Sequence, residues 1–307
     1  MAYEAGRSIR QCGYRVVAAM MADETFEVLR PTAWTAPVLF NSPHSGLRYE
    51  AAFLRSSRLS PTALRKSEDC YVDELFMRCL AHGAPLLRAH APRCYIDLNR
   101  EPYELDPRMF AGELPGYVNR ASPRVAGGLG TIPRIVAEGE EIYRGRLATA
   151  EAMTRIEQIY LPYHRALSAL LDEVMKNHGA GLLVDCHSMP SSALAHALQA
   201  DIVLGDRFGS ACDEEITRFV EELLAARGLR TLRNKPYAGG FITQSHGAPR
   251  SGRHALQIEI NRALYMNEAT LEKSAGFVAL QLVLDSVIAE LLRGIGGMMV
   301  PHRLAAE

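Results

Sequence analysis

Short apolar runs alternate with longer segments of helical periodicity along this chain. Runs at 37–42, 85–89, 94–98, 181–186, 202–204 and 255–260 are typical of strands. Apolar residues recur at helical spacing over about 64–80, 147–177, 212–227 and 268–293. We expect the second helix to kink at Pro162 and to end before Gly179, which suits a left-handed C-cap. Alternating strands and helices predict an α/β fold, a mixed and largely parallel sheet flanked by helices on both faces.

Residues 101–143 interrupt this pattern. They are rich in proline, glycine and arginine and show no sustained periodicity. A connection of this length without its own elements is typical of a functional loop region, so we expect substrate contacts there. We predict one α/β domain over 31–300, preceded by an extension at 1–30 that is partly disordered.

Composition restricts the class of partner. The 307 residues are 48% hydrophobic and 22% charged with a net charge of −1, which is typical of a globular enzyme and gives no broad charge for nucleic acid or an anionic membrane. No apolar run is as long as a membrane span, and residues 16–22 are short and weakly apolar for a signal peptide. The six cysteines form no CxxC pair, which favours a reducing, cytoplasmic location. We expect a small-molecule substrate. The sequence does not indicate whether the protein is a monomer or an oligomer.

Two histidines follow strand-like runs, and both are metal-ligand candidates. His44 stands in Ser42-Pro43-His44-Ser45-Gly46, and His187 in Asp185-Cys186-His187-Ser188. An imidazole at the carboxyl end of a buried strand reaches the sheet edge, where it can bind a metal instead of packing into the core. Asp185 shares a strand face with His187, so we expect it either to orient the histidine ring or to cap a neighbouring helix. Cys186 points to the opposite face, which argues against a cysteine nucleophile paired with His187.

Further polar clusters occur in Asp69-Cys70-Tyr71-Val72-Asp73, Asp97-Leu98-Asn99-Arg100 and Gln257-Ile258-Glu259-Ile260-Asn261. With the histidine motifs and residues 125–134 and 239–243, they resemble the N-formylglutamate amidohydrolase family from about residue 37 to 267. The family is similar in fold to zinc carboxypeptidases and aspartoacylases. The resemblance therefore implies a zinc ion held by two histidines and one carboxylate, with His44 and His187 at the histidine positions.

The third metal ligand departs from the carboxypeptidase pattern. Position 47, three residues after His44, is leucine and cannot coordinate a metal. We choose Asp69, because the acidic pair at 68–69 falls at an expected helix start. Glu68 and Asp73 remain alternatives. A further alternative is that these acidic residues bind no metal and simply complement the helix dipole, as negative charges at a helix start often do.

Glu259 is the catalytic candidate. Leu256, Ile258 and Ile260 alternate on one strand face, whereas Gln257, Glu259 and Asn261 lie on the other. On pattern alone, this is equally an edge strand with a polar face in water. In the resemblance, Glu259 matches the glutamate that acts as general base and then as general acid.

Arginines near Asn99 are candidates for substrate binding. Arg93, Arg100, Arg120, Arg124 and Arg134 crowd into one stretch of sequence. A guanidinium matches a carboxylate in two parallel hydrogen bonds, so Asn99, Arg100 and Arg134 are chosen to bind an acidic N-acyl amino acid. The alternative is surface ion pairs with Glu101, Glu113 and Glu138.

The function that these residues and the resemblance imply is hydrolysis of N-formyl-L-glutamate to formate and L-glutamate. Two alternatives stay open. One is a related deacylase or carboxypeptidase-like amidase with another substrate, and the other is a catalytically idle protein that binds an acidic ligand. No phosphate-binding GxxxxGK[ST] sequence occurs, and Gly127-Gly128-Leu129-Gly130 does not open a helix after a strand, so nucleotide chemistry is unsupported.

Overall fold

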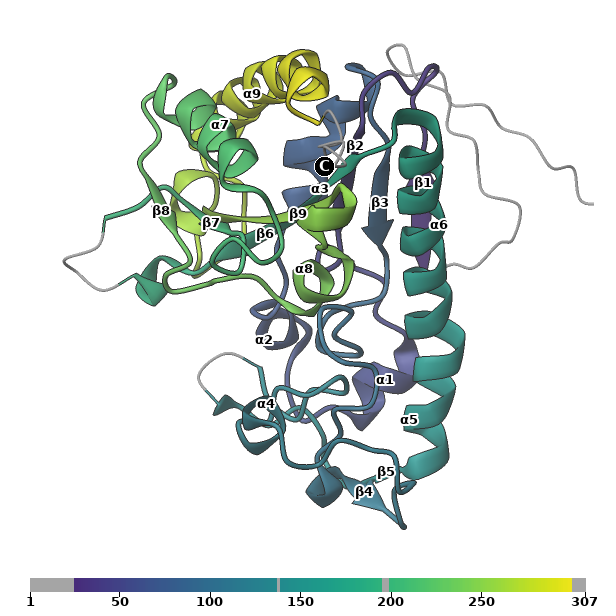
Figure 1. Cartoon of the computed structure of the whole chain (residues 1–307). Coiled ribbons are helices and arrows are strands. Elements are labelled where there is room, and N and C mark those ends of the chain that lie inside the picture. Colours follow the sequence, from purple (N-terminus) through teal and green to yellow (C-terminus); the bar gives the residue numbers. More distant parts are fainter. Residues whose placement is uncertain (1–24, 137–138, 195–198, 300–307) are drawn as a thin grey trace, which may run out of the picture.

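The computed structural model describes residues 25–136, 139–194 and 199–299, which contain a central seven-stranded sheet (Figure 1). The strand order is β1-β3-β2-β6-β9-β7-β8. The strands are β1 (Phe26–Leu29), β2 (Val38–Ser42), β3 (Leu86–Ala89), β6 (Gly181–Met189), β7 (Ile202–Gly205), β8 (Thr231–Arg233) and β9 (Arg253–Asn261). A separate pair joins β4 (Phe110–Ala111) to β5 (Leu147–Ala148).

The sheet is mixed and largely parallel, as predicted. Strands β3, β2, β6 and β9 run parallel at its centre. Strand β1 pairs antiparallel with β3, and β7 pairs antiparallel with β9 but parallel with β8. The carboxyl ends of the central strands therefore meet at one edge, where α/β sheets bind ligands. Within the described ranges, no helix is long and apolar enough to span a membrane.

The helices cover both faces of the sheet (Figure 1). They are α1 (Ala51–Ser56), α2 (Pro61–Arg65), α3 (Val72–Phe76), α4 (Pro123–Ala126), α5 (Thr149–Arg155), α6 (Leu161–His178), α7 (Glu214–Ala225), α8 (Phe241–His246) and α9 (Gly276–Met298). Val184, Leu256 and Ile258 pack in one buried cluster with apolar residues of α3, α7 and α9. Leu183 and Ala255 point the other way, into a second cluster with residues of α5, α6 and α8. Strand alternation thus divides the core into two layers.

The long helical segment predicted over 147–177 contains a local break. A π-helical turn, Ile156–Tyr160, separates α5 from α6, and Pro162 lies in the first turn of α6. Proline lacks the N–H that an α-helix interior requires, so the backbone changes its hydrogen bonding just before it. The predicted C-cap is confirmed, since Gly179 has φ 77° and its N–H donates to Met175 O at 2.8 Å.

Three predicted elements differ from the structure. The apolar stretch 94–98 forms turns rather than a strand, because the Asp97 carboxylate accepts the Asn99 N–H at 2.9 Å and so stabilises a local turn. The helix expected over 64–80 is divided into short helices, and Tyr71 at φ 64° interrupts it. The last helix begins at Gly276 instead of 268, since the Asn267 side chain accepts the Ala269 and Thr270 N–H groups in a turn.

The expected N-terminal extension at 1–30 includes residues 1–24, which lie outside the described ranges, as does the segment 16–22. Its last part contains β1, which pairs with β3 at the edge of the sheet. The boundary between extension and domain stays a prediction.

Candidate metal centre

His44 and His187 meet at the carboxyl edge of the sheet. His44 lies two residues after β2, and His187 lies near the end of β6, directly beside Glu259 in β9. The two imidazole ring centres are 4.9 Å apart, and both side chains are buried. The parallel pairing of β2, β6 and β9 therefore brings together three residues that are far apart in sequence.

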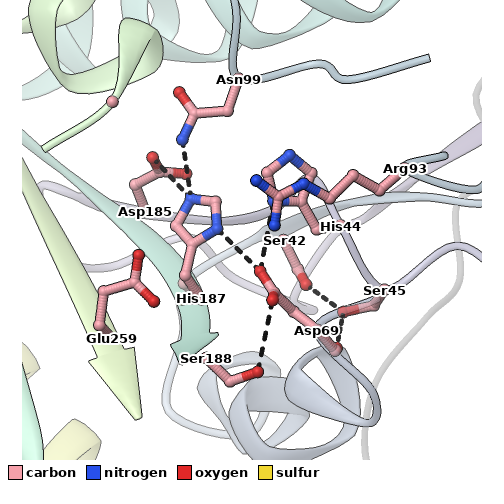
Figure 2. Close-up of polar contacts among 12 residues, drawn as sticks. Ser42, His44, Ser45, Asp69, Arg93, Asn99, Asp185, His187, Ser188 and Glu259 are labelled. Atoms are coloured by element: carbon pink, nitrogen blue, oxygen red, sulfur yellow. Dashed lines mark hydrogen bonds and ion pairs between the residues drawn. The ribbon is translucent and has the colours of Figure 1, made fainter. Parts of the chain in front are cut away.

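Asp69 lies between the two imidazoles (Figure 2). Its Oδ2 is 2.9 Å from His187 Nδ1 and 3.3 Å from His44 Nδ1. One ligand atom from each of these three residues lies within 4.8 Å of the others. Two imidazoles and one carboxylate at this spacing are a donor set that suits zinc.

The outer nitrogen of each ring faces a second carboxylate. His44 Nε2 is 2.8 Å from Asp97 Oδ1, and His187 Nε2 is 3.0 Å from Asp185 Oδ2. Asp185 in turn accepts a hydrogen bond from Asn41 Nδ2 at 2.7 Å, which fixes the carboxylate. Such partners orient a metal-binding imidazole and leave its Nδ1 for the metal. The predicted contact between Asp185 and His187 is thereby confirmed.

Of the three candidates for a third ligand, Asp69 faces the histidines, whereas Glu68 and Asp73 are paired with other residues. Glu68 accepts the Tyr49 hydroxyl at 2.5 Å, and Asp73 accepts Arg88 Nη1 at 2.9 Å. Arg262 Nη2 donates to Asp69 Oδ1 at 3.1 Å, which leaves Oδ2 facing the histidines. Burial opposes ionisation of Asp69, but its contacts with His187 and His44 hold its pKa well below the usual range. The ionised carboxylate is the form that binds a metal.

Glu259 is buried beside this cluster and does not lie on a solvated edge strand. Strand β9 is inside the sheet, and Glu259 is only 7% exposed. Burial raises its pKa to about 7, opposed by the nearby charge of His187. A carboxyl group with a pKa near neutrality suits proton transfer in both directions.

Two side-chain amides connect the start of α8 to the cluster. The Gly240 N–H donates to Gln257 Oε1 at 2.7 Å, and Gln257 Nε2 donates to Glu259 Oε1 at 2.8 Å. Asn99 Oδ1 accepts the Ile242 N–H at 2.8 Å, which turns its Nδ2 toward His187 Nε2 at 3.1 Å. A Cβ on Gly240 would lie within 2.6 Å of three Asn99 side-chain atoms, so only glycine fits this close approach.

The predicted arginines do not form one cluster. Arg100 donates through Nε to Leu129 O and through Nη1 to Asn99 O, both at 2.9 Å, so much of its fork is occupied by backbone. Arg134 pairs with Asp106 at 3.1 Å and Glu141 at 3.3 Å, and its substrate role stays a prediction. Arg93 contacts Asp97 through Nε at 3.1 Å, and its guanidinium lies beside His44 in Figure 2.

Sequence reasoning counted Arg93 among the arginine candidates but did not choose it, and it assigned no role to Asp97 or Arg262. The signal for Asp97 was present, because it stands two residues before Asn99 as Asp185 stands two before His187. Arg262 follows β9 by one residue, but no sequence pattern pairs it with Asp69. Cys186 packs in the core on the opposite face of β6, and burial raises its pKa far above the usual range, which agrees with an inert thiol.

Comparison with known proteins agrees with this architecture. An N-formylglutamate deformylase of Pseudomonas putida is 30% identical over 238 residues, which cover 76% of this chain and 82% of that protein. A second, from Pseudomonas aeruginosa, is 28% identical, with 79% and 86% coverage. The crystal structure of an N-formylglutamate amidohydrolase from Ralstonia eutropha superposes with a TM-score of 0.83 at 35% identity and covers 88% of this chain and 97% of its own. The sequence model of the family matches residues 36–266, and the chain belongs to the N-formylglutamate amidohydrolase family.

Proposed function

We propose that this protein is a zinc-dependent amidohydrolase that cleaves N-formyl-L-glutamate to formate and L-glutamate. The observation that carries the proposal is the convergence of His44, Asp69 and His187 within 4.8 Å, beside the buried Glu259. The relatives named above are described as acting on the same compound. His44 and His187 would hold the ion through Nδ1, and Asp69 through Oδ2. When bound, zinc supplies a Lewis acid that polarises the amide carbonyl and lowers the pKa of water.

Glu259 moves the proton in this proposal. Its carboxylate takes a proton from water as the oxygen attacks the formyl carbon, and returns it to the nitrogen as the C–N bond breaks. Gln257 holds Oε1 of Glu259 at 2.8 Å, so the carboxylate has a fixed direction. The products are then formate and the free amine of glutamate.

Arg93 is the arginine we assign to the reacting centre. It uses Nε for Asp97, and its two terminal nitrogens have no hydrogen-bond partner among the described residues. Its charge acts on Asp69 and Glu259, which places it among the groups of the cluster. A guanidinium with both terminal nitrogens free to donate suits the developing oxyanion or a substrate carboxylate. Asn99 and Arg100 border the same site and are proposed to contact the substrate.

A substrate panel tests the proposal. Purified protein loaded with zinc is incubated with N-formyl-glutamate, N-formyl-glutamine and N-acetyl-glutamate, and formate or acetate and amine are measured. We expect equal amounts of formate and glutamate from the first compound, loss of turnover after chelation and recovery with zinc. Turnover of another member of the panel alone would indicate a related deacylase. Tight binding of N-formyl-glutamate with no amine release would indicate a non-catalytic binder.

A further inference from the structure

A polar cavity lies in the region between α1, the β4–β5 pair and the loop that ends at β5. Its volume is about 190 Å³, and Arg58, Arg108, Arg134, Arg144 and Arg146 line it with a single acid, Glu141. None of His44, Asp69, His187 or Glu259 lines it. The cavity is therefore a separate feature of the molecule, built mainly from the loop region in the lower part of Figure 1.

Carboxylates hold part of the arginine cluster in place. Asp106, which is only 2% exposed, accepts Arg108 Nη2 at 2.7 Å and Arg134 Nε at 3.1 Å. Glu141 pairs with Arg134 at 3.3 Å and with Arg58 at 3.2 Å. These guanidinium groups are positioned before any ligand arrives, which reduces the entropy lost on binding.

Arg144 and Arg146 have N–H donors that are not used in hydrogen bonds within the described part of the chain. Arg144 uses its Nε for Ser57 O at 2.9 Å, and Arg146 has no hydrogen-bond or ion-pair partner in the described part of the chain. Glu141 and Asp106 together balance two of the five positive charges around the cavity. Uncompensated guanidinium groups that converge on one space form an anion site.

We propose that this cavity binds a small polyanion of the phosphate class. Its 190 Å³ is more than ten times the roughly 10–15 Å³ that one buried water requires, so a tetrahedral oxyanion fits. An anion with several oxygens engages two or more guanidinium forks at once, whereas a monocarboxylate engages one. The site is independent of the proposed hydrolytic reaction.

Inorganic phosphate is the probe, with chloride at equal ionic strength as the reference. Binding to the full-length zinc-loaded protein is measured by calorimetry at pH 8, where phosphate carries two charges. We expect Arg146→Gln and Arg144→Gln each to weaken phosphate binding by at least ~5-fold, since a hydrogen bond to a charged group is lost. Arg250→Gln is the matched control, because Arg250 is exposed, lies outside the cavity and has no hydrogen-bond or ion-pair partner among the described residues. It should bind phosphate as the unaltered protein does.

A variant at the metal centre separates the two sites. His187→Ala should keep its phosphate affinity, and Arg146→Gln should keep its rate of formate release. Phosphate binding that survives in both cavity variants, that disappears in His187→Ala, or that is no stronger than chloride binding would overturn the proposal. Absence of amidase activity in every protein would contradict the hydrolase function alone and leave this test intact.

Discussion

The candidate metal centre and the arginine cavity both gather charged side chains, but in opposite surroundings. At the centre, Asp69 and His187 are 1% and 2% exposed, and each charged group faces at least one fixed partner. At the cavity, the Arg58 and Arg108 side chains are 48% and 63% exposed, and water and salt screen their charges. A change at the buried centre leaves a charge unpaired, whereas a change at the cavity removes one of several screened charges. The difference predicts where substitutions have large effects.

The largest effect is expected at Asp69. Asp69→Asn keeps the size of the side chain but removes the negative charge between the two imidazoles, and it weakens the pairing of Arg262. Zinc affinity, measured by competition with a chelator, should fall by at least ~10²-fold, the upper range for losing even an outer partner of a metal ligand. Asp73→Asn is the control, because Asp73 pairs with Arg88 instead. Loss of zinc in the control with retention in Asp69→Asn would assign the third ligand to Asp73.

A substitution at Glu259 distinguishes a role in proton transfer from a role in metal binding. Glu259→Gln preserves the shape of the side chain but cannot accept a proton, so turnover of N-formyl-glutamate should drop by at least ~10²-fold. Zinc content, measured by mass spectrometry of the metal, should stay at the level of the unaltered protein. Near-normal turnover with full zinc content would show that Glu259 is only a buried polar residue.

We expect intermediate effects on catalysis from lysine substitutions at Arg93, beside the histidines, and at Arg134, at the cavity. Lysine cannot reproduce a bidentate guanidinium, so Arg93→Lys should lower kcat/KM by about tenfold or more, in line with the 1.5–3 kcal/mol of a hydrogen bond to a charged group. Arg134→Lys should lower it much less, because Arg134 pairs with Asp106 and Glu141. The reverse order would restore the sequence-based choice of Arg134 as a substrate-binding residue.

The last prediction concerns the stability of the metal-free protein. Burial raises the pKa of Glu259 from 4.5 to about 7, so the folded state holds a proton that the unfolded chain releases. The resulting stability is complete below pH 4.5 and is lost as the pH rises through 7. In urea unfolding, Glu259→Gln should gain on the unaltered protein between pH 5 and pH 8, by at most roughly 3 kcal/mol. An equal difference at both pH values would show that this carboxyl group does not titrate on folding.

Local patterns along the chain were sufficient for strands β2, β3, β6, β7 and β9 of the central sheet, but not for β1 or β8. The alternation of Leu256, Ile258 and Ile260 with Gln257 and Glu259 gave the correct faces of β9, because side chains on a strand alternate whatever lies around them. Gly179 ended its helix as predicted, since the left-handed cap is a local property of glycine. Apolar spacing failed at 94–98, where a side-chain hydrogen bond to the backbone replaced strand pairing.

The sequence by itself determined the strand periodicity, the positions of His44 and His187 at strand ends, and the family resemblance. Only the tertiary structure placed Asp69 rather than Glu68 or Asp73 between the histidines, because the choice depends on which carboxylates Arg88 and Tyr49 occupy. Only the fold showed that Arg134 pairs with Asp106 whereas Arg93 contacts Asp97, although both arginines stand in one stretch of sequence. Strand pairing and ion pairing join residues distant along the chain, and their geometry follows from packing that no local pattern contains.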